Sequence, residues 1–209
     1  NEPEELEQAA DEIPTELPSD ERALRLVFRD VTTCTIEPAD AKDFDDALSI
    51  RSIEEGKWEV GVHIADVTHY VKEDSVIEAE GRERATSVYL VDRTIPMLPE
   101  KLSNFLCSLR PDEEKLCFSA VFEMDEELNI TKEWLGRTII KSNRRFTYEE
   151  AQQIIETGEG DFKEEILTLK RLAQKMRAEH FRNGAITLGR GEAKFTLDEN
   201  GKPTGVYIK

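Results

Sequence analysis

The chain has 209 residues, of which 38% are hydrophobic and 35% are charged, and its formal net charge is −17 at pH 7. This composition provides for a core under a heavily charged surface, and no apolar run approaches the roughly 20 residues of a membrane helix. The acidic balance argues against a broad basic surface for nucleic acid. It does not exclude an RNA substrate, because nine acids fall in residues 1–21, which contain no Lys or Arg.

The three cysteines, Cys34, Cys107 and Cys117, lack the paired spacing of a metal site. An odd number of cysteines in a chain of this size is typical of reduced thiols in a cytosolic protein. No signal peptide opens the sequence. We therefore expect a soluble cytoplasmic protein without a membrane partner, and the start at Asn1 rather than Met suggests a fragment of a longer chain.

Residues 1–24 combine acids with Pro3, Pro14 and Pro18. Such a stretch is typical of a flexible acidic linker with room for one short helix. Residues 25–209 then form the folded part. The prediction is therefore a linker followed by one domain.

The remaining elements follow from apolar patterns and capping residues. We expect strands at residues 32–36, 47–53 and 58–66, a helix that a Ser75–Glu78 capping box starts, and short extended segments at 87–91 and 95–99. Antiparallel strands at 115–124 and 130–140 follow, then helices from Thr147 to about 157 and from Asp161 to about 184, and a hairpin at 193–208 around Asn200-Gly201. Without a regular βαβ rhythm, this order predicts an α+β fold with a mixed, largely antiparallel sheet packed with helices.

Five acidic residues are concentrated in the stretch TIEPADAKDFDDA at residues 35–47, between two predicted strands. Ionised carboxylates this close repel one another unless they bind a cation or spread into water. Carboxylate oxygens without His or Cys suit Mg²⁺ or Mn²⁺ better than Zn²⁺. A solvated acidic turn is the alternative. If residues 43–46 are nearly extended, Asp46 points away from Asp43 and Asp45, and a kink in the loop is needed for all three to converge. The five acids are Glu37, Asp40, Asp43, Asp45 and Asp46.

This stretch resembles the signature of the RNB exoribonucleases, the ribonuclease II and ribonuclease R family, whose usual form is TID-x-x-DAKD-x-DDA. The similarity continues through the blocks VHIADV (62–67), TSVY (86–89), IPMLP (95–99), LSN (102–104) and CSL (107–109). It covers roughly residues 29–209 and is closest to the ribonuclease R form. One departure is Glu37, where the family signature has Asp.

The resemblance implies the N-terminal portion of an RNB-type catalytic domain. Its activity would be 3′→5′ exoribonuclease cleavage at the 3′ end of single-stranded RNA, releasing nucleoside 5′-monophosphates with Mg²⁺ or Mn²⁺. It assigns Glu37, Asp43, Asp45 and Asp46 to the metal site, with Asp43 and Asp45 catalytic. We expect this portion alone to be inactive, and RNA-decay or ribosome-associated factors to be partners of the full-length protein.

The resemblance also assigns two RNA-binding positions. Tyr89 matches a tyrosine that stacks on the 3′-terminal nucleotide, and Leu188, in GAITL, takes the place of its usual aromatic partner. From the residues alone, Tyr89 is expected in the core between Val88 and Leu90, and His63 is expected to be a hydrogen-bonded core residue. Arg137, Lys141, Arg144 and Arg145 form either a phosphate-binding patch or an ordinary solvated face.

Two other functions stay open. The chain could belong to an inactive, nuclease-derived RNA-binding or scaffold protein, as Glu37 and Leu188 suggest. It could also be a structural divalent-cation-binding module without any RNA substrate.

Overall fold

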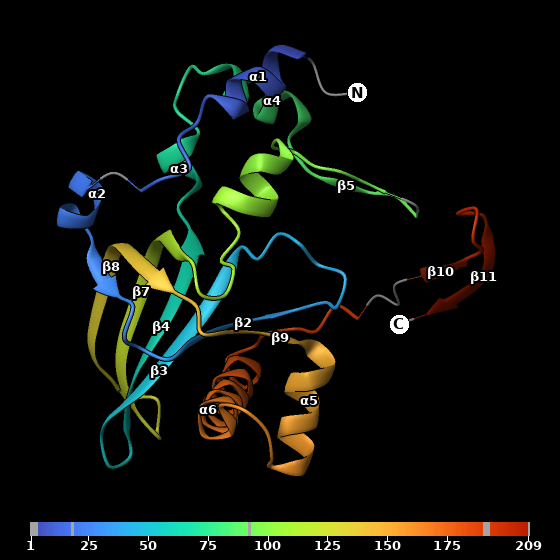
Figure 1. Ribbon diagram of the computed structural model, residues 1–209. Helices are drawn as coiled ribbons and strands as arrows, with labels where there is room; N and C mark the ends of the chain where they lie inside the picture. Colours follow the sequence, from blue (N-terminus) through green and yellow to red (C-terminus); the bar gives the residue numbers. More distant parts are fainter. Residues whose placement is uncertain (1–3, 18, 92, 190–192, 209) are drawn as a thin grey trace.

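A seven-stranded sheet runs through the computed structural model, which describes residues 4–17, 19–91, 93–189 and 193–208 (Figure 1). The strand order is β1-β8-β7-β4-β3-β2-β9. Only the outer pairs β1–β8 and β2–β9 are parallel, and the four pairs between them are antiparallel. The predicted α+β fold with a mixed, largely antiparallel sheet is therefore confirmed. The strands are β1 (Leu26–Phe28), β2 (Thr33–Glu37), β3 (Asp46–Glu54), β4 (Lys57–Ala65), β7 (Glu114–Asp125), β8 (Ile130–Lys141) and β9 (Arg144–Thr147).

Helices pack on the sheet in two groups. α5 (Tyr148–Thr157) and α6 (Lys163–Arg182) lie below the sheet in Figure 1 and bury Phe146, Ile154 and Leu172. The second group lies above the sheet, and its side chains join strand residues in the largest core cluster. Its members are α1 (Glu4–Asp11), α3 (Val67–Tyr70), α4 (Val76–Arg84) and the π-helix η1 (Lys101–Leu106), while α2 (Ser19–Leu24) precedes β1.

Two small hairpins extend from this body (Figure 1). One pairs β5 (Val88–Tyr89) with β6 (Thr94–Ile95), and the other pairs β10 (Ala193–Leu197) with β11 (Pro203–Ile208). The second hairpin turns at the predicted Asn200-Gly201, where Gly201 has a φ of +75°. Among the described residues, no helix is both long and apolar enough to cross a membrane. The three cysteines are buried and unpaired.

The N-terminal stretch differs from the expected flexible linker. In α1, Leu6 and Ala10 are only 1% and 2% exposed, because they pack into the core cluster with residues of α4 and η1. Lys101 Nζ also donates to the carbonyl oxygens of Asp11 (2.8 Å) and Ile13 (3.0 Å). The apolar residues recur at helical spacing, so this stretch can bury one face despite its acids. Pro3 and Pro18 lie outside the described residues.

Two predicted helix starts are correct and one is wrong. Ser75 caps α4, and Thr147 forms a capping box with Glu150 at the start of α5. Asp161 does not cap α6, because the chain enters that helix through Phe162 in a left-handed conformation (φ +51°). The Phe162 ring lies edge-on to Phe146 at 6.2 Å, so core packing determines this turn.

Apolar residues recur along α6, but only those in its first half are buried. Ile166 and Leu172 are 3% exposed, whereas Met176 is 43% and Phe181 is 42% exposed. Every residue from 173 to 189 is exposed, including His180. Among the described residues, the side chains of α6 are buried by other elements only as far as Leu172.

Candidate functional site

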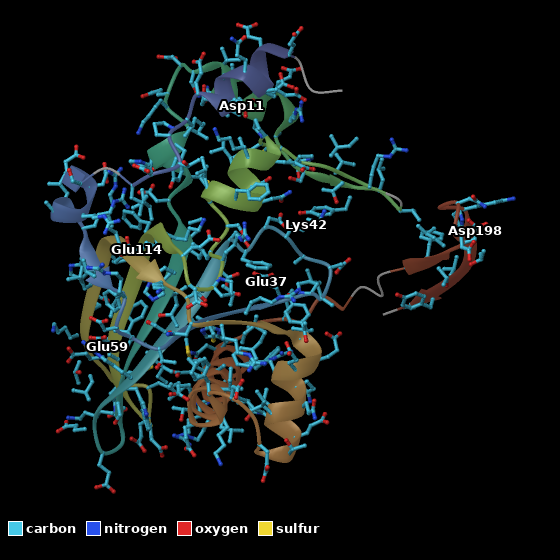
Figure 2. All side chains as sticks on the ribbon, viewed as in Figure 1. Asp11, Glu37, Lys42, Glu59, Glu114 and Asp198 are labelled. Atoms are coloured by element: carbon cyan, nitrogen blue, oxygen red, sulfur yellow. The ribbon has the colours of Figure 1, made fainter. Side chains whose placement is uncertain are left out.

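Three carboxylates meet where β2 ends and β3 begins. Glu37 is the last residue of β2 and Asp46 the first of β3, and the acidic loop (residues 38–45) joins them. Because β2 and β3 are antiparallel neighbours, the two strand ends lie together. Carboxylate oxygens of Glu37, Asp45 and Asp46 all lie within 4.8 Å of one another. Figure 2 shows Glu37 at this edge of the sheet, with Lys42 in the loop.

The loop path lets neighbouring acids converge. Phe44 turns into the core cluster, and Asp43 and Asp45 on either side of it remain exposed. Asp43 is not among the three described acids whose oxygens lie within 4.8 Å, yet it is close enough to raise the pKa of Glu37. Asp40 is exposed in the loop. The structure thus brings together three of the four acids predicted for the metal site and leaves Asp43 beside them.

The cluster is electrostatically unfavourable without a cation. Burial, followed by the charges of the neighbouring acids Asp46, Asp45 and Asp43, raises the pKa of Glu37 to about 7, although Arg145 opposes this effect. Burial and the Asp45 charge also raise the pKa of Asp46. Glu37 is 8% exposed, and its buried Oε1 has no hydrogen-bond partner among the residues that the structure describes.

A buried carboxylate oxygen without a partner, beside like charges, is what a divalent cation would satisfy. The donor set contains only carboxylate oxygens, so the residues fit a hard ion such as Mg²⁺ or Mn²⁺ better than Zn²⁺.

Distant residues hold the acidic loop in place. Ser108 Oγ accepts from the Phe44 amide (3.1 Å) and donates to the Lys42 carbonyl (2.9 Å), and the Leu109 amide donates to the Phe44 carbonyl (2.8 Å). Arg145 Nη2 donates to the carbonyls of Pro38 and Ala39 at 2.6 and 2.9 Å. Sequence reasoning gave these residues no such role, because their partners lie more than 60 positions away.

The two residues assigned to RNA lie outside the core. Tyr89, in β5, is 71% exposed, so the alternative of a core tyrosine is wrong. Burial, with the charges of Asp43 and Asp45, raises the pKa of its hydroxyl, which places the ring near the acidic loop. Leu188 follows α6 and is 84% exposed.

His63 and the basic residues have structural partners. His63 is fully buried between Ser119 Oγ (2.6 Å) and Ser49 Oγ (2.8 Å), and burial lowers its pKa to about 4. Its predicted role as a hydrogen-bonded core residue is confirmed. The basic residues do not form one free patch, because Arg144 pairs with Glu150 and Asp161, Arg137 pairs with Asp66, and Arg145 binds the loop carbonyls.

Comparison with known proteins matches the RNB domain family over residues 25–209. DIS3-like exonuclease 2 of Schizosaccharomyces pombe is 43% identical over 192 residues, covering 84% of this chain and 21% of that protein. Ribonuclease R 1 of Lactococcus lactis is 40% identical over 207 residues, covering 96% of this chain and 25% of that protein. Mycoplasma genitalium RNase R, solved with ribose-methylated single-stranded RNA, is 28% identical, with a TM-score of 0.89 over 100% of this chain and 33% of that chain.

These relatives are much longer than the chain, which spans about a fifth to a quarter of the curated proteins above. One relative of similar identity is named an inactive exonuclease: DIS3L2 of Arabidopsis thaliana, 39% identical over 207 residues, covering 91% of this chain and 20% of that protein. The matched family and the similar fold of RNase R are both consistent with a carboxylate cluster at the acidic loop. The chain belongs to the RNB domain family, whose model it matches from residue 25 to residue 209.

Proposed function

We propose that the protein to which this chain belongs is a 3′→5′ exoribonuclease that hydrolyses single-stranded RNA from its 3′ end to nucleoside 5′-monophosphates. The observation that carries the proposal is the carboxylate cluster of Glu37, Asp45 and Asp46 within an RNB domain. The names of the relatives, ribonuclease R and exonuclease, support the same activity.

In this proposal Glu37, Asp45 and Asp46 hold Mg²⁺ or Mn²⁺, and Asp43 completes the site. A divalent ion held there supplies charge relief on the phosphate and a water that is acidic near neutral pH. Asp43 is exposed beside the cluster, where its carboxylate can orient a water and accept its proton. Asp45 is exposed, and one of its carboxylate oxygens lies within 4.8 Å of those of Glu37 and Asp46, which supports a catalytic role for it as well.

Tyr89 and Leu188 are proposed to bind the RNA. A base stacked on an aromatic ring gains about 1–3 kcal/mol, and every base offers such a face. The β5–β6 hairpin presents Tyr89 to solvent near the acidic loop, which supports stacking there. Leu188 lacks an aromatic face, so its contribution is smaller. A cytoplasmic location and RNA-decay or ribosome-associated partners belong to the same proposal for the whole protein.

A second candidate is an inactive RNA-binding or scaffold protein. Two observations favour it: Glu37 replaces the signature Asp, and a relative of similar identity is named inactive. One extra methylene lengthens the side chain by more than about 1 Å, and loss of geometry on that scale reduces catalysis strongly. A structural cation-binding module without RNA has no separate support.

The test uses the full-length parent and single-stranded RNA labelled at its 5′ end, with Mg²⁺ or with EDTA. We expect stepwise shortening from the 3′ end in Mg²⁺ and none in EDTA. Asp45→Asn should abolish cleavage with nearly unchanged RNA affinity, since binding depends mainly on phosphate and stacking contacts. Asp40→Asn, a change in the same loop outside the cluster, should leave cleavage intact. RNA that is bound but stays intact in both Mg²⁺ and Mn²⁺ would favour the inactive candidate.

We expect the isolated chain to bind the ion without cleaving RNA. Cleavage by the isolated chain would show that the described residues suffice for catalysis.

A further inference from the structure

Arg145 links the two ends of the acidic loop. It lies on β9, where the parallel ladder sets it beside Thr35, two residues before Glu37. Its Nη2 donates to the carbonyl oxygens of Pro38 (2.6 Å) and Ala39 (2.9 Å), the first two residues of the loop. Its guanidinium carbon lies 5.5 Å from the centre of the Phe44 ring, near the other end of the loop. One side chain therefore contacts the backbone after Glu37 and the residue before Asp45.

The Phe44 end is fixed independently. Its amide donates to Ser108 Oγ, and its carbonyl accepts from the Leu109 amide at 2.8 Å. The Asp45 carbonyl accepts from the Ala65 amide at 3.0 Å. Asp45 and Asp46 are thus tied to the sheet through their own backbone. The Pro38 end has one internal bond, from the Ala41 amide to the Pro38 carbonyl (3.1 Å), so Arg145 is the described side chain that ties this end to the sheet.

Stability alone does not account for the way Arg145 is placed. Its Nε is buried without a hydrogen-bond partner among the described residues. Burying a donor in this way is unfavourable. The hydrogen bonds of Nη2 also direct one arm of the guanidinium toward the loop carbonyls.

We propose that Arg145 is a positioning residue, which sets the distance of the Glu37 carboxylate from Asp45 and Asp46 by clamping the start of the acidic loop against Phe44. The inference rests on the proposed function in one respect, that these carboxylates bind a divalent cation. Its geometric part, the ordering of the loop by Arg145, holds with or without an ion.

The test compares Arg145→Met and Arg145→Lys with Arg144→Lys as the matched control. The control changes the neighbouring arginine, which pairs with Glu150 and Asp161 instead of the loop. Lys keeps the charge of Arg145 but not its planar fork, and Met removes both. The first readout is amide hydrogen exchange in EDTA. We expect exchange at Ala41 to be about tenfold faster or more in both Arg145 variants and unchanged in the control.

The second readout is calorimetric titration with Mn²⁺ at a temperature where all variants are folded. A positioning role and a purely electrostatic role of Arg145 predict opposite changes in Mn²⁺ affinity for Arg145→Met. Removing a positive charge beside a cation site would by itself tighten binding, whereas loss of an outer-shell support weakens it by about 10–100-fold. We expect weaker binding in Arg145→Met and only partial recovery in Arg145→Lys.

The outcomes separate the inference from the proposed function. Equal or tighter Mn²⁺ binding by Arg145→Met, or unchanged exchange at Ala41, would overturn the role of Arg145. Absence of Mn²⁺ binding by the unaltered chain would count against the proposed metal site, while the exchange experiment would still decide whether Arg145 orders the loop. If Arg145→Met does not fold, Arg145→Lys carries both readouts, because it keeps the charge and most of the side-chain length.

Discussion

Replacing Glu37 with Gln should stabilise the metal-free protein and weaken its stabilisation by Mn²⁺. Glu37 is 8% exposed beside other acids, and its pKa rises from 4.5 to about 7, first through burial and then through those acids. A tenfold change in an ionisation constant corresponds to about 1.4 kcal/mol, so the ionised carboxylate costs up to about 3 kcal/mol in the folded state. Gln has a similar shape and no charge, so it avoids this cost.

The effect depends on pH in a defined direction. The pKa of Glu37 is higher in the folded protein than in the unfolded chain, so its contribution to stability is fully present below pH 4.5. That contribution is lost as the pH rises toward about 7. The gain in free energy of unfolding that Glu37→Gln brings to the metal-free protein should therefore be largest, up to about 3 kcal/mol, at pH 8. It should fall below about 1 kcal/mol at pH 5.

Urea unfolding at both pH values, in EDTA and in excess Mn²⁺, measures these differences. Mn²⁺ should stabilise the unaltered chain by mass action and Glu37→Gln much less. The variant should therefore be the more stable protein in EDTA and the less stable one in excess Mn²⁺. Asp40→Asn is the control, since it removes an exposed acid of the same loop outside the cluster. Equal unfolding free energies for the unaltered chain and Glu37→Gln at pH 8 in EDTA would refute the reasoning about charge crowding.

Three further outcomes are expected. Leu6→Ala should lower the free energy of unfolding by about 2–5 kcal/mol in urea titrations, whereas Leu24→Ala, at a position 79% exposed, should have little effect; equal effects would contradict the packing of α1. His63 should stay neutral at pH 5.5, because burial lowers its pKa to about 4, and a ring-nitrogen NMR midpoint near 6.5 would contradict this. In the full-length parent, Tyr89→Ala should leave a longer end product at an unchanged melting temperature, and Leu188→Phe a shorter one; unchanged product lengths would argue against stacking.

Local chemistry in the sequence predicted most of the sheet and several turns. Apolar patterns identified β4, β7 and β8, and a Thr-x-x-Glu pattern identified the start of α5. These features depend on neighbours within a few positions, which a single sequence displays. The predicted cap at Asp161 was wrong because Phe162 packs on Phe146, sixteen positions earlier in the chain.

The candidate site was predictable in composition and less so in geometry. The acids of residues 37–46 stand out in the sequence, between two predicted strands. The sequence did not indicate which of them converge, because the path of the loop depends on Ser108 and Arg145. The packing of α1 was not predicted because its sequence is rich in acids. Its burial becomes favourable only when α4 and η1 present an apolar surface.

The position of the acidic loop explains how the fold tolerates a repulsive site. An isolated hairpin carrying these acids would spread them into water, because ordering like charges costs free energy and only Lys42 compensates within the loop. Here the loop is held in place, since Phe44 is packed against the core cluster. The Phe44 carbonyl accepts a hydrogen bond from the Leu109 amide, and the Asp45 carbonyl accepts one from the Ala65 amide at the end of β4. Burial of an apolar side chain and several hydrogen bonds thus offset the repulsion. The carboxylates stay convergent before any ion arrives, and a cation binding there would meet a site already organised for it.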